Sequence, residues 1–263
     1  AANLLKDYAS SDFLRDRGES LGEGDERTLV DLLVEQIEFA DVVVLNKIST
    51  ASEEERDLAC KVIRSLNPDA RIEEVDFGKV PLEAILDTKR FDFNKAHEHP
   101  LWYKELHGFA SHTPETEEYG VRSFVYRARR PFDPERFQSF IDKGWPGVVR
   151  AKGFFWLATR PDFVGEISQA GALVRTGKRG RWWSSVPKQY WPEEPEWQRA
   201  MEPYFHKVWG DRRQEIVFIG VDPMQEDALV GELDQCLLEE EDFVPERWSG
   251  LKDPFPNWSA AAA

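Results

Sequence analysis

The run Val42-Val43-Val44-Leu45 constrains the fold of this 263-residue chain more than any other feature. Three β-branched residues in succession favour a strand, and an apolar run without polar alternation is typical of a parallel strand covered on both faces. Apolar residues recur at helical spacing before this run, in residues 25–40, and after it, in residues 52–66. The first 90 residues therefore predict an α/β unit.

Local signals set the expected ends of these elements. Asp25 can cap the first helix, and Ser52 followed by Glu55 forms a capping-box pattern at the start of the second. Asn67-Pro68 ends that helix, because the residue before a proline is disfavoured in a helical conformation. A strand at about residues 72–77 and a short helix after it complete the order α-β-α-β-α. That order predicts a doubly wound parallel sheet.

The pattern changes after residue 119. Residues 123–128 alternate as a strand, and Pro134 starts a helix. Four further strands are expected, at about residues 148–158, 171–176, 181–184 and 215–221. A helix over residues 226–238 follows. The order β-α-β-β-β-β-α predicts an α+β domain with a mostly antiparallel sheet.

Charge divides the chain in a similar way. Residues 1–119 carry 14 basic and 27 acidic side chains, residues 120–220 carry 18 and 11, and residues 221–263 carry 2 and 11. The net charge of −15 disfavours a general binder of polyanions, while the basic segment either faces its acidic neighbours or binds an acidic partner. No run approaches the roughly 18 apolar residues of a membrane helix, so we expect no membrane partner.

Asn46-Lys47-Ile48-Ser49 follows the first apolar strand directly. Ligands of open α/β sheets bind at the carboxyl ends of strands, and an Asn-Lys pair there is similar to the guanine-recognition loop of P-loop GTPases. In that loop the lysine stem covers the base, and an aspartate two residues on accepts both guanine N–H donors. Ser49 stands in that place, and one hydroxyl cannot offer a bidentate carboxylate. Asn46, Lys47 and Ser49 are candidate nucleotide-binding residues with guanine selectivity left open; the alternative is a plain turn.

Longer motifs carry a resemblance to a known family. Residues 25–47 resemble the CobW-like branch of the metal-associated P-loop GTPases. Segments downstream are similar to that family's C-terminal domain, and they include Arg127-Ala128-Arg129-Arg130-Pro131-Phe132, residues 150–156 and Gly210-Asp211-Arg212-Arg213-Gln214-Glu215. The similarity runs over roughly residues 4–258. Several long motifs in the same order are more specific than one tetrapeptide.

The resemblance implies a cytoplasmic, GTP-dependent metal chaperone or metal-insertion protein for zinc or cobalt, with a client metalloprotein as its partner. GTP with Mg²⁺ would be the cofactor of the complete protein. The family's phosphate loop, ending Gly-Lys-Ser/Thr, does not occur in this sequence. We therefore expect a C-terminal portion that lacks an N-terminal GTPase segment, and we assign no catalytic residue. The alternative is a non-enzymatic module that docks a client metalloenzyme, for example as an activator of nitrile hydratase.

The expected domains follow from the resemblance and the charge pattern. Residues 1–90 form the C-terminal part of a GTPase-like α/β domain, with a truncated doubly wound P-loop-type sheet whose first strand has an unpaired edge. Residues 91–119 form a linker rich in His and Glu. Residues 120–240 form the CobW-like α+β domain, and residues 241–263 form a tail that ends in an alanine cloning scar.

Four of the five histidines lie in the expected linker: His97, His99, His107 and His112. Imidazole and carboxylate groups are zinc ligands, so these histidines with a nearby glutamate are candidates for a weak, flexible Zn²⁺ site. The alternative is a polar loop with solvated histidines, because His-x-His holds tetrahedral zinc poorly without a preformed scaffold. Cys60 and Cys236 form neither a disulfide framework nor a thiolate metal motif, which favours a reducing compartment and a structural role.

Basic and tryptophan side chains are interleaved in the second module: Lys152, Arg175, Lys178, Arg179, Arg181, Arg212 and Arg213 with Trp156, Trp182, Trp183 and Trp209. Such side chains could stack on bases and contact phosphates. An interface with a protein or with the GTPase module is a second interpretation. A third interpretation is that the tryptophans pack in the core and that Asp211 and Arg212 form an internal ion pair. We do not expect a nucleic-acid partner.

Overall fold

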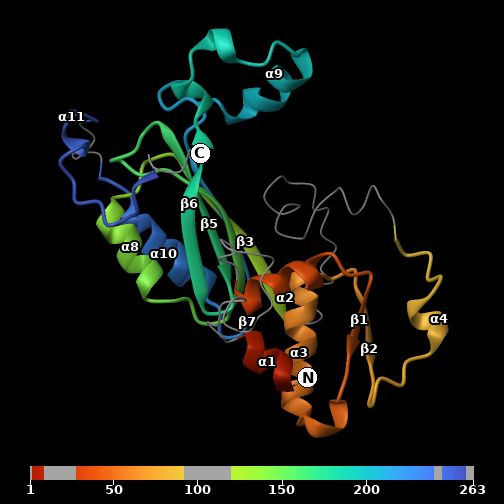
Figure 1. Ribbon diagram of the computed structural model, residues 1–263. Helices are drawn as coiled ribbons and strands as arrows, with labels where there is room; N and C mark the ends of the chain where they lie inside the picture. Colours follow the sequence, from red (N-terminus) through yellow and green to blue (C-terminus); the bar gives the residue numbers. More distant parts are fainter. Residues whose placement is uncertain (1, 9–27, 92–119, 240–244, 259–263) are drawn as a thin grey trace.

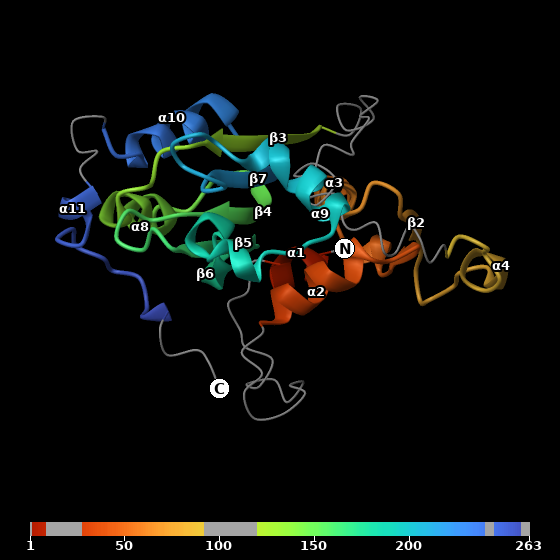
Figure 2. The same cartoon turned by 90° about the horizontal axis from the view of Figure 1, so that it is seen from above.

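The computed structural model describes residues 2–8, 28–91, 120–239 and 245–258. Its elements lie in four layers, seen in two perpendicular views in Figures 1 and 2. Helices α8 (Pro134–Asp142) and α10 (Glu226–Cys236) cover one face of a five-stranded sheet. Helices α2 (Leu29–Glu38) and α3 (Glu53–Leu66) pack on the opposite face and separate it from a two-stranded sheet.

The five-stranded sheet is antiparallel throughout and has the order β3-β7-β4-β5-β6, which confirms the predicted mostly antiparallel sheet. Its strands are β3 (Val121–Ala128), β4 (Val148–Phe155), β5 (Phe163–Ala170), β6 (Leu173–Arg181) and β7 (Gln214–Val221).

Two strand predictions in this sheet are wrong. The patterns place separate strands at residues 171–176 and 181–184 and none at residues 163–170, whereas β5 occupies residues 163–170 and β6 is one strand over residues 173–181. Gly171 lies in the β5–β6 turn with φ +56°, and a Cβ there would meet the Tyr8 carbonyl oxygen at 2.0 Å. The turn therefore requires glycine where a strand start was expected.

Strand β7 lies in the middle of the core, and all eight of its residues are buried. Ile216 and Phe218 pack with α8 and α10, while Val217 and Ile219 pack with α2 and α3. Alternate residues of a strand point to opposite faces, so β7 supplies both cores at once. The sheet is consequently covered by helices on both sides.

Caps define the first helices. Ser52 and Glu55 form the predicted capping box at the start of α3, with Glu55 N–H donating to Ser52 Oγ at 3.2 Å. Helix α2 starts later than Asp25 would set it, because Thr28 is its N-cap and forms a capping box with Asp31. Each box satisfies two backbone donors that a helix terminus leaves open. Helix α1 (Ala2–Tyr8) lies beside α2 and α3.

The second sheet is a parallel pair, β1 (Val42–Leu45) and β2 (Arg71–Glu74), followed by the short helix α4 (Leu82–Ile85). The sequence predicts this α-β-α-β-α order. Coverage of β1 on both faces is wrong for the described residues: Val44 is 39% exposed, and a groove of about 380 Å³ runs along the strand. Among the described residues β1 pairs with β2 alone, and the truncated doubly wound sheet stays a prediction.

Residues 182–213 connect β6 to β7 and are called the Trp-rich excursion. This segment contains α9 (Pro195–Met201) and projects beyond the end of the sheet in Figure 1. Helix α11 (Pro245–Trp248) packs Trp248 against Trp156. In the described ranges no helix is long and apolar enough to cross a membrane. The expected boundary at residue 119 falls outside the described residues, and the division into domains stays a prediction.

A buried ion pair joins the two parts of the chain. Arg150 on β4 donates from Nε to Glu38 Oε1 at 2.9 Å, and the two side chains are 5% and 4% exposed. A second pair, Arg175 with Asp31 at 3.0 Å, lies between β6 and α2. The basic segment thus faces its acidic neighbour, one of the two roles considered for it. Burial raises the pKa of Glu38, and the Arg150 charge offsets only part of that rise.

This balance predicts that breaking the pair costs more stability than replacing it. Arg150→Met alone leaves a buried carboxylate without its cation and should lower the free energy of unfolding by about 3–5 kcal/mol. Glu38→Leu combined with Arg150→Met should cost much less than the single change, because the desolvation of both charges is removed. Urea unfolding followed by tryptophan fluorescence measures both losses.

The control is Arg56→Met, which breaks the exposed Arg56–Glu74 pair and should cost under about 1 kcal/mol. Equal losses in the single and double variants of the buried pair would show that the charges contribute only through packing.

Candidate functional site

A candidate nucleotide site lies where β1 and β2 end, at the same edge of the parallel pair. Lys47 follows β1 in the left-handed region, with φ 60° and ψ 40°, and turns the chain into the short 3₁₀ helix Ile48–Thr50. Phe77 and Gly78 follow β2 with φ 55° and 66°. Non-glycine residues rarely adopt this conformation, and such strain concentrates at functional sites.

Side-chain hydrogen bonds tie the two loops together. Asn46 Oδ1 accepts from Gly78 N–H at 3.1 Å. Ser49 donates twice to Asp76 Oδ1, from its backbone N–H at 3.1 Å and from its hydroxyl at 2.8 Å. The strand end itself is held by Val75 N–H donating to the Leu45 carbonyl at 3.0 Å. The loop is therefore fixed in shape rather than a free turn.

The predicted base-binding residues are close neighbours in sequence, and their role in binding a base stays a prediction. Asn46, Lys47 and Ser49 occupy one loop, with Lys47 and Ser49 exposed to solvent. Sequence reasoning missed Asp76, which the fold brings to Ser49 across 27 positions. A signal existed: Asp76 follows the next strand along the chain, and the ends of parallel strands meet at one edge.

The predicted metal ligands lie outside the described residues: His97, His99, His107 and His112 all fall within 92–119. In the parts of the chain that the structure describes, no group of three or more His, Cys, Asp or Glu side chains is placed to hold a metal ion. The histidine site thus stays a prediction from the sequence.

The two cysteines are free thiols, and Cys236 is buried in the α10 core. Its thiol donates to the Glu232 carbonyl, and burial raises its pKa to about 12. A thiol with such a pKa remains protonated at neutral pH and is a poor metal ligand. The structural role expected for this residue fits its surroundings.

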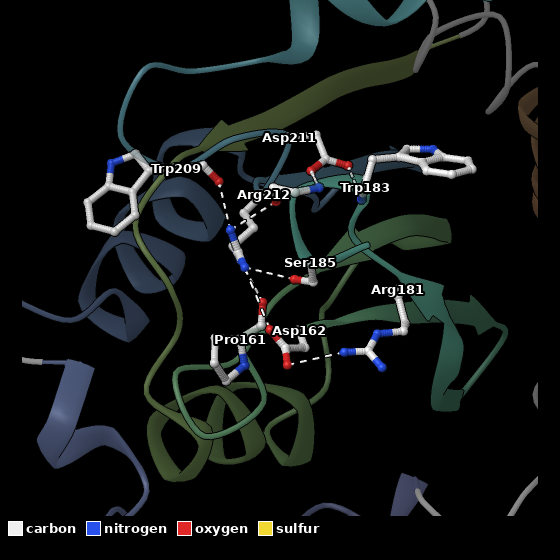
Figure 3. A network of polar contacts seen from close by, with 9 residues as sticks. Pro161, Asp162, Arg181, Trp183, Ser185, Trp209, Asp211 and Arg212 are labelled. Carbon is white, nitrogen blue, oxygen red and sulfur yellow. Dashed lines mark hydrogen bonds and ion pairs between the residues drawn. The ribbon is translucent and has the colours of Figure 1, made fainter. Parts of the chain in front are cut away.

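A second polar site lies where the Trp-rich excursion rejoins the sheet, before β7 (Figure 3). Asp211 is 2% exposed and accepts two backbone N–H groups, from Trp183 at 2.8 Å and from Ser184 at 2.9 Å. The Arg212 guanidinium donates to the Pro161 carbonyl and to the Ser185 hydroxyl, at 2.6 and 2.8 Å. Asp211 thus joins the two ends of the excursion, and Arg212 attaches them to the segment that precedes β5.

Gln214 and Glu215 continue this network into the core. Gln214 is fully buried; its Oε1 accepts from Trp156 N–H at 3.0 Å, and its Nε2 donates to the Arg130 and Trp156 carbonyls. Glu215 is 3% exposed and accepts from Arg127 and Arg213. Buried polar groups must be paired, and the Asp-Arg-Arg-Gln-Glu run meets that requirement.

The predicted ion pair between Asp211 and Arg212 is wrong. Asp211 caps backbone groups, and the carboxylate facing Arg212 is that of Asp162, at 3.7 Å. Asp162 also pairs with Arg181 at 3.3 Å. Asp211 lies in a turn, and its two carboxylate oxygens are taken by the backbone N–H groups of Trp183 and Ser184.

The tryptophans of the basic and aromatic set divide into two groups. Trp156 and Trp182 are buried in a core cluster, as the packing interpretation expected. Trp183 and Trp209 are partly buried, and Figure 3 shows their rings pointing away from the network in opposite directions. Trp183 packs against Trp191 and Trp197 of the excursion. The geometry therefore supports internal pairing and packing for most of this set.

A comparison with known families relates this part of the chain to a described domain. Residues 121–237 match the family described as the cobalamin synthesis protein cobW C-terminal domain. Because of this similarity, residues 121–237 are called the cobW domain below. The match bears out the resemblance in the downstream motifs, while residues 25–47 lie outside it. The antiparallel sheet from β3 to β7, with α8 and α10, falls within the matched residues.

Two relatives match most of the chain. A zinc-regulated GTPase metalloprotein activator of Dictyostelium discoideum is 40% identical over 255 residues, covering 95% of this chain and 53% of the relative. A zinc chaperone of Mycobacterium tuberculosis is 31% identical over 251 residues, covering 91% and 58%. The chain thus spans just over half the length of these relatives.

A solved structure, the Zn(II)-bound YjiA GTPase from E. coli, is 16% identical, with a TM-score of 0.37. The match covers 79% of this chain and 55% of that one, and the score is too low to support any detailed superposition.

The polar network gives a prediction for the cobW domain. Asp211→Asn exchanges one acceptor oxygen for a donor and leaves one buried N–H of Trp183 or Ser184 unpaired, which should cost about 1–3 kcal/mol. The matched control, Asp162→Asn, changes a half-exposed carboxylate in the same network and should cost under about 1 kcal/mol. Urea unfolding measures both, and faster chymotrypsin cleavage of the excursion should accompany the first. Equal behaviour of the two variants would contradict the capping role.

Proposed function

We propose that the complete protein is a cytoplasmic, GTP-dependent metal chaperone that delivers zinc to a client metalloprotein. The observation that carries the proposal is the Asn46–Ser49 loop, tied to the end of β2 and joined to a cobW C-terminal domain through a shared core. The names of the zinc-regulated activator and the zinc chaperone support the metal and the client.

In this proposal the described residues bind the base and not the phosphates. Asn46 fixes the loop through Gly78, and the exposed Lys47 stem lies over one face of the guanine. The β1–β2 pair with α2 and α3 is one end of a doubly wound sheet, and the open edge of β1 is where such a sheet continues. Contacts to the phosphates and to Mg²⁺ are assigned to no described residue.

The cobW domain is proposed to dock the client. Its Trp-rich excursion projects from the sheet, and a groove of about 600 Å³ is lined by Trp191, Trp197 and Phe205. The excursion is anchored by Asp211 and Arg212, so its position is set by the end of β7.

The base-binding role predicts the nucleotide preference of the complete protein. Calorimetry should show tighter binding of GDP than of ADP. Lys47→Ala removes the apolar stem that covers the base and should weaken GDP binding about 10-fold, the effect of roughly two buried methylene groups. The control Lys61→Ala, an exposed lysine on α3, should leave the affinity unchanged. Equal affinities for GDP and ADP, or equal affinities of the two variants, would contradict this role.

The zinc role predicts a pH-dependent site in residues 92–119. The complete protein should bind at least one Zn²⁺ more than a variant with His97, His99, His107 and His112 changed to Ala. That difference should disappear as the pH falls through about 6.5, where imidazoles become protonated and lose the ligand lone pair. Zinc titration against a competing chelator at pH 7.5 and 5.5 measures it. The same stoichiometry and affinity in both proteins would reduce the segment to a linker.

A further inference from the structure

We propose that Asp76 supplies the carboxylate that reads the guanine base, in the role that Ser49 cannot fill alone. This inference rests on the proposed function, because it assigns a specificity-determining residue to the same nucleotide site. Asp76 comes from the loop after β2 and reaches Ser49 in the loop after β1. The juxtaposition is created by the parallel pairing of the two strands.

The Ser49–Asp76 pair presents two acceptors side by side. Both donors of Ser49, its N–H and its hydroxyl, bind Asp76 Oδ1 at 3.1 and 2.8 Å. Among the described residues, Asp76 Oδ2 receives no hydrogen bond from a side chain or a backbone N–H. The Ser49 hydroxyl, having given its proton to Asp76, keeps its oxygen lone pairs as acceptors.

Guanine requires this arrangement at its Watson–Crick edge. Its N1–H and its 2-amino group are adjacent donors, so Oδ2 can accept one and the Ser49 hydroxyl oxygen the other. Adenine offers an acceptor at N1 and only a C–H at C2, so it would face the carboxylate without a donor. Hydrogen bonds to an ionised acceptor are the stronger kind, and leaving one unmade is costly. Discrimination against adenine follows.

The position of Asp76 is fixed independently of any ligand. Asn46 Oδ1 binds Gly78 N–H two residues after Asp76, and Ile48 N–H donates to the Val75 carbonyl one residue before it. The carboxylate is half-buried and belongs to no ion pair among the described residues. A site held in shape before binding loses less entropy when the base arrives.

A cap of the 3₁₀ helix Ile48–Thr50 is the role Asp76 would have if it only supported the loop. Base selectivity separates the two roles. Asp76→Asn keeps the size and, through its carbonyl oxygen, the bonds from Ser49, but it turns an amide donor toward the base. That donor repels the 2-amino group of guanine and matches the 2-oxo group of xanthine.

The experiment measures the binding of GDP, xanthosine diphosphate and ADP to the complete protein by calorimetry. Asp76→Asn should weaken GDP binding about 10- to 100-fold, the range for one hydrogen bond to a charged group, and should strengthen xanthosine diphosphate binding. The control is Glu74→Gln, at the end of β2 and two residues before Asp76. It changes a carboxylate that pairs with Arg56 and should leave all three affinities unchanged.

An exchange of the two side chains provides a rescue. Ser49→Asp alone places two carboxylates in contact and should weaken GDP binding, because like charges at this distance repel. Adding Asp76→Ser should restore both the affinity for GDP and the preference for it over ADP, since one carboxylate and one hydroxyl again face the base. A merely structural cap would not regain base preference in this way.

The outcomes separate this inference from the proposed function. Wild-type protein that prefers GDP to ADP, with Asp76→Asn showing unchanged ratios among the three nucleotides, would overturn the role of Asp76 and leave the proposed function standing. Wild-type protein that binds no guanosine nucleotide would overturn the proposed function and this inference together. A shift from guanosine toward xanthosine in Asp76→Asn, with rescue by the exchange, is the expected result.

Discussion

Burial of β7 on both faces is the constraint on which the rest of the structure depends. A fully buried strand in an antiparallel sheet needs apolar partners on each side, and β7 alternates Ile216 and Phe218 toward α8 and α10 with Val217 and Ile219 toward α2 and α3. In the described residues the second set is covered by α2 and α3, from the first part of the chain. The cobW domain and the segment that carries the nucleotide loop therefore share a core.

The shared core connects the two ends of the proposed mechanism. Helix α2 ends at Glu38, which pairs with Arg150 of the five-stranded sheet. Strand β1 starts four residues later and leads into Asn46. On the other side, β7 starts at Gln214, directly after the Asp211–Arg213 segment that anchors the Trp-rich excursion. The proposed base loop and the proposed client-docking excursion are thus both attached to one packed unit, which is the arrangement a nucleotide-controlled chaperone requires.

Patterns local in sequence predicted most helices and strands. Contacts between residues distant in sequence could not be predicted from such patterns. The Ser52–Glu55 capping box, the helix starting at Pro134 and the apolar strand before Asn46 are readable because their causes lie within a few residues. Strand β5 was missed because its polar positions hide the alternation and Gly171 marks a turn rather than a strand. Asp76 was missed as the partner of Ser49 because only the β1–β2 register brings them together. The same is true of Asp162 and Arg212, where adjacency along the chain suggested the wrong carboxylate.

The shared core is the central claim, and native-state hydrogen exchange tests it most directly. If β7 holds both parts together, the slowest amides of α2 and α3 should open with the same free energy as those of β4 and β7, and Arg150→Met should lower all of them by the same amount. Exchange of α2 and α3 at free energies several kcal/mol below those of β4 and β7, with only the helices responding to the substitution, would contradict the account and show two independently folding units.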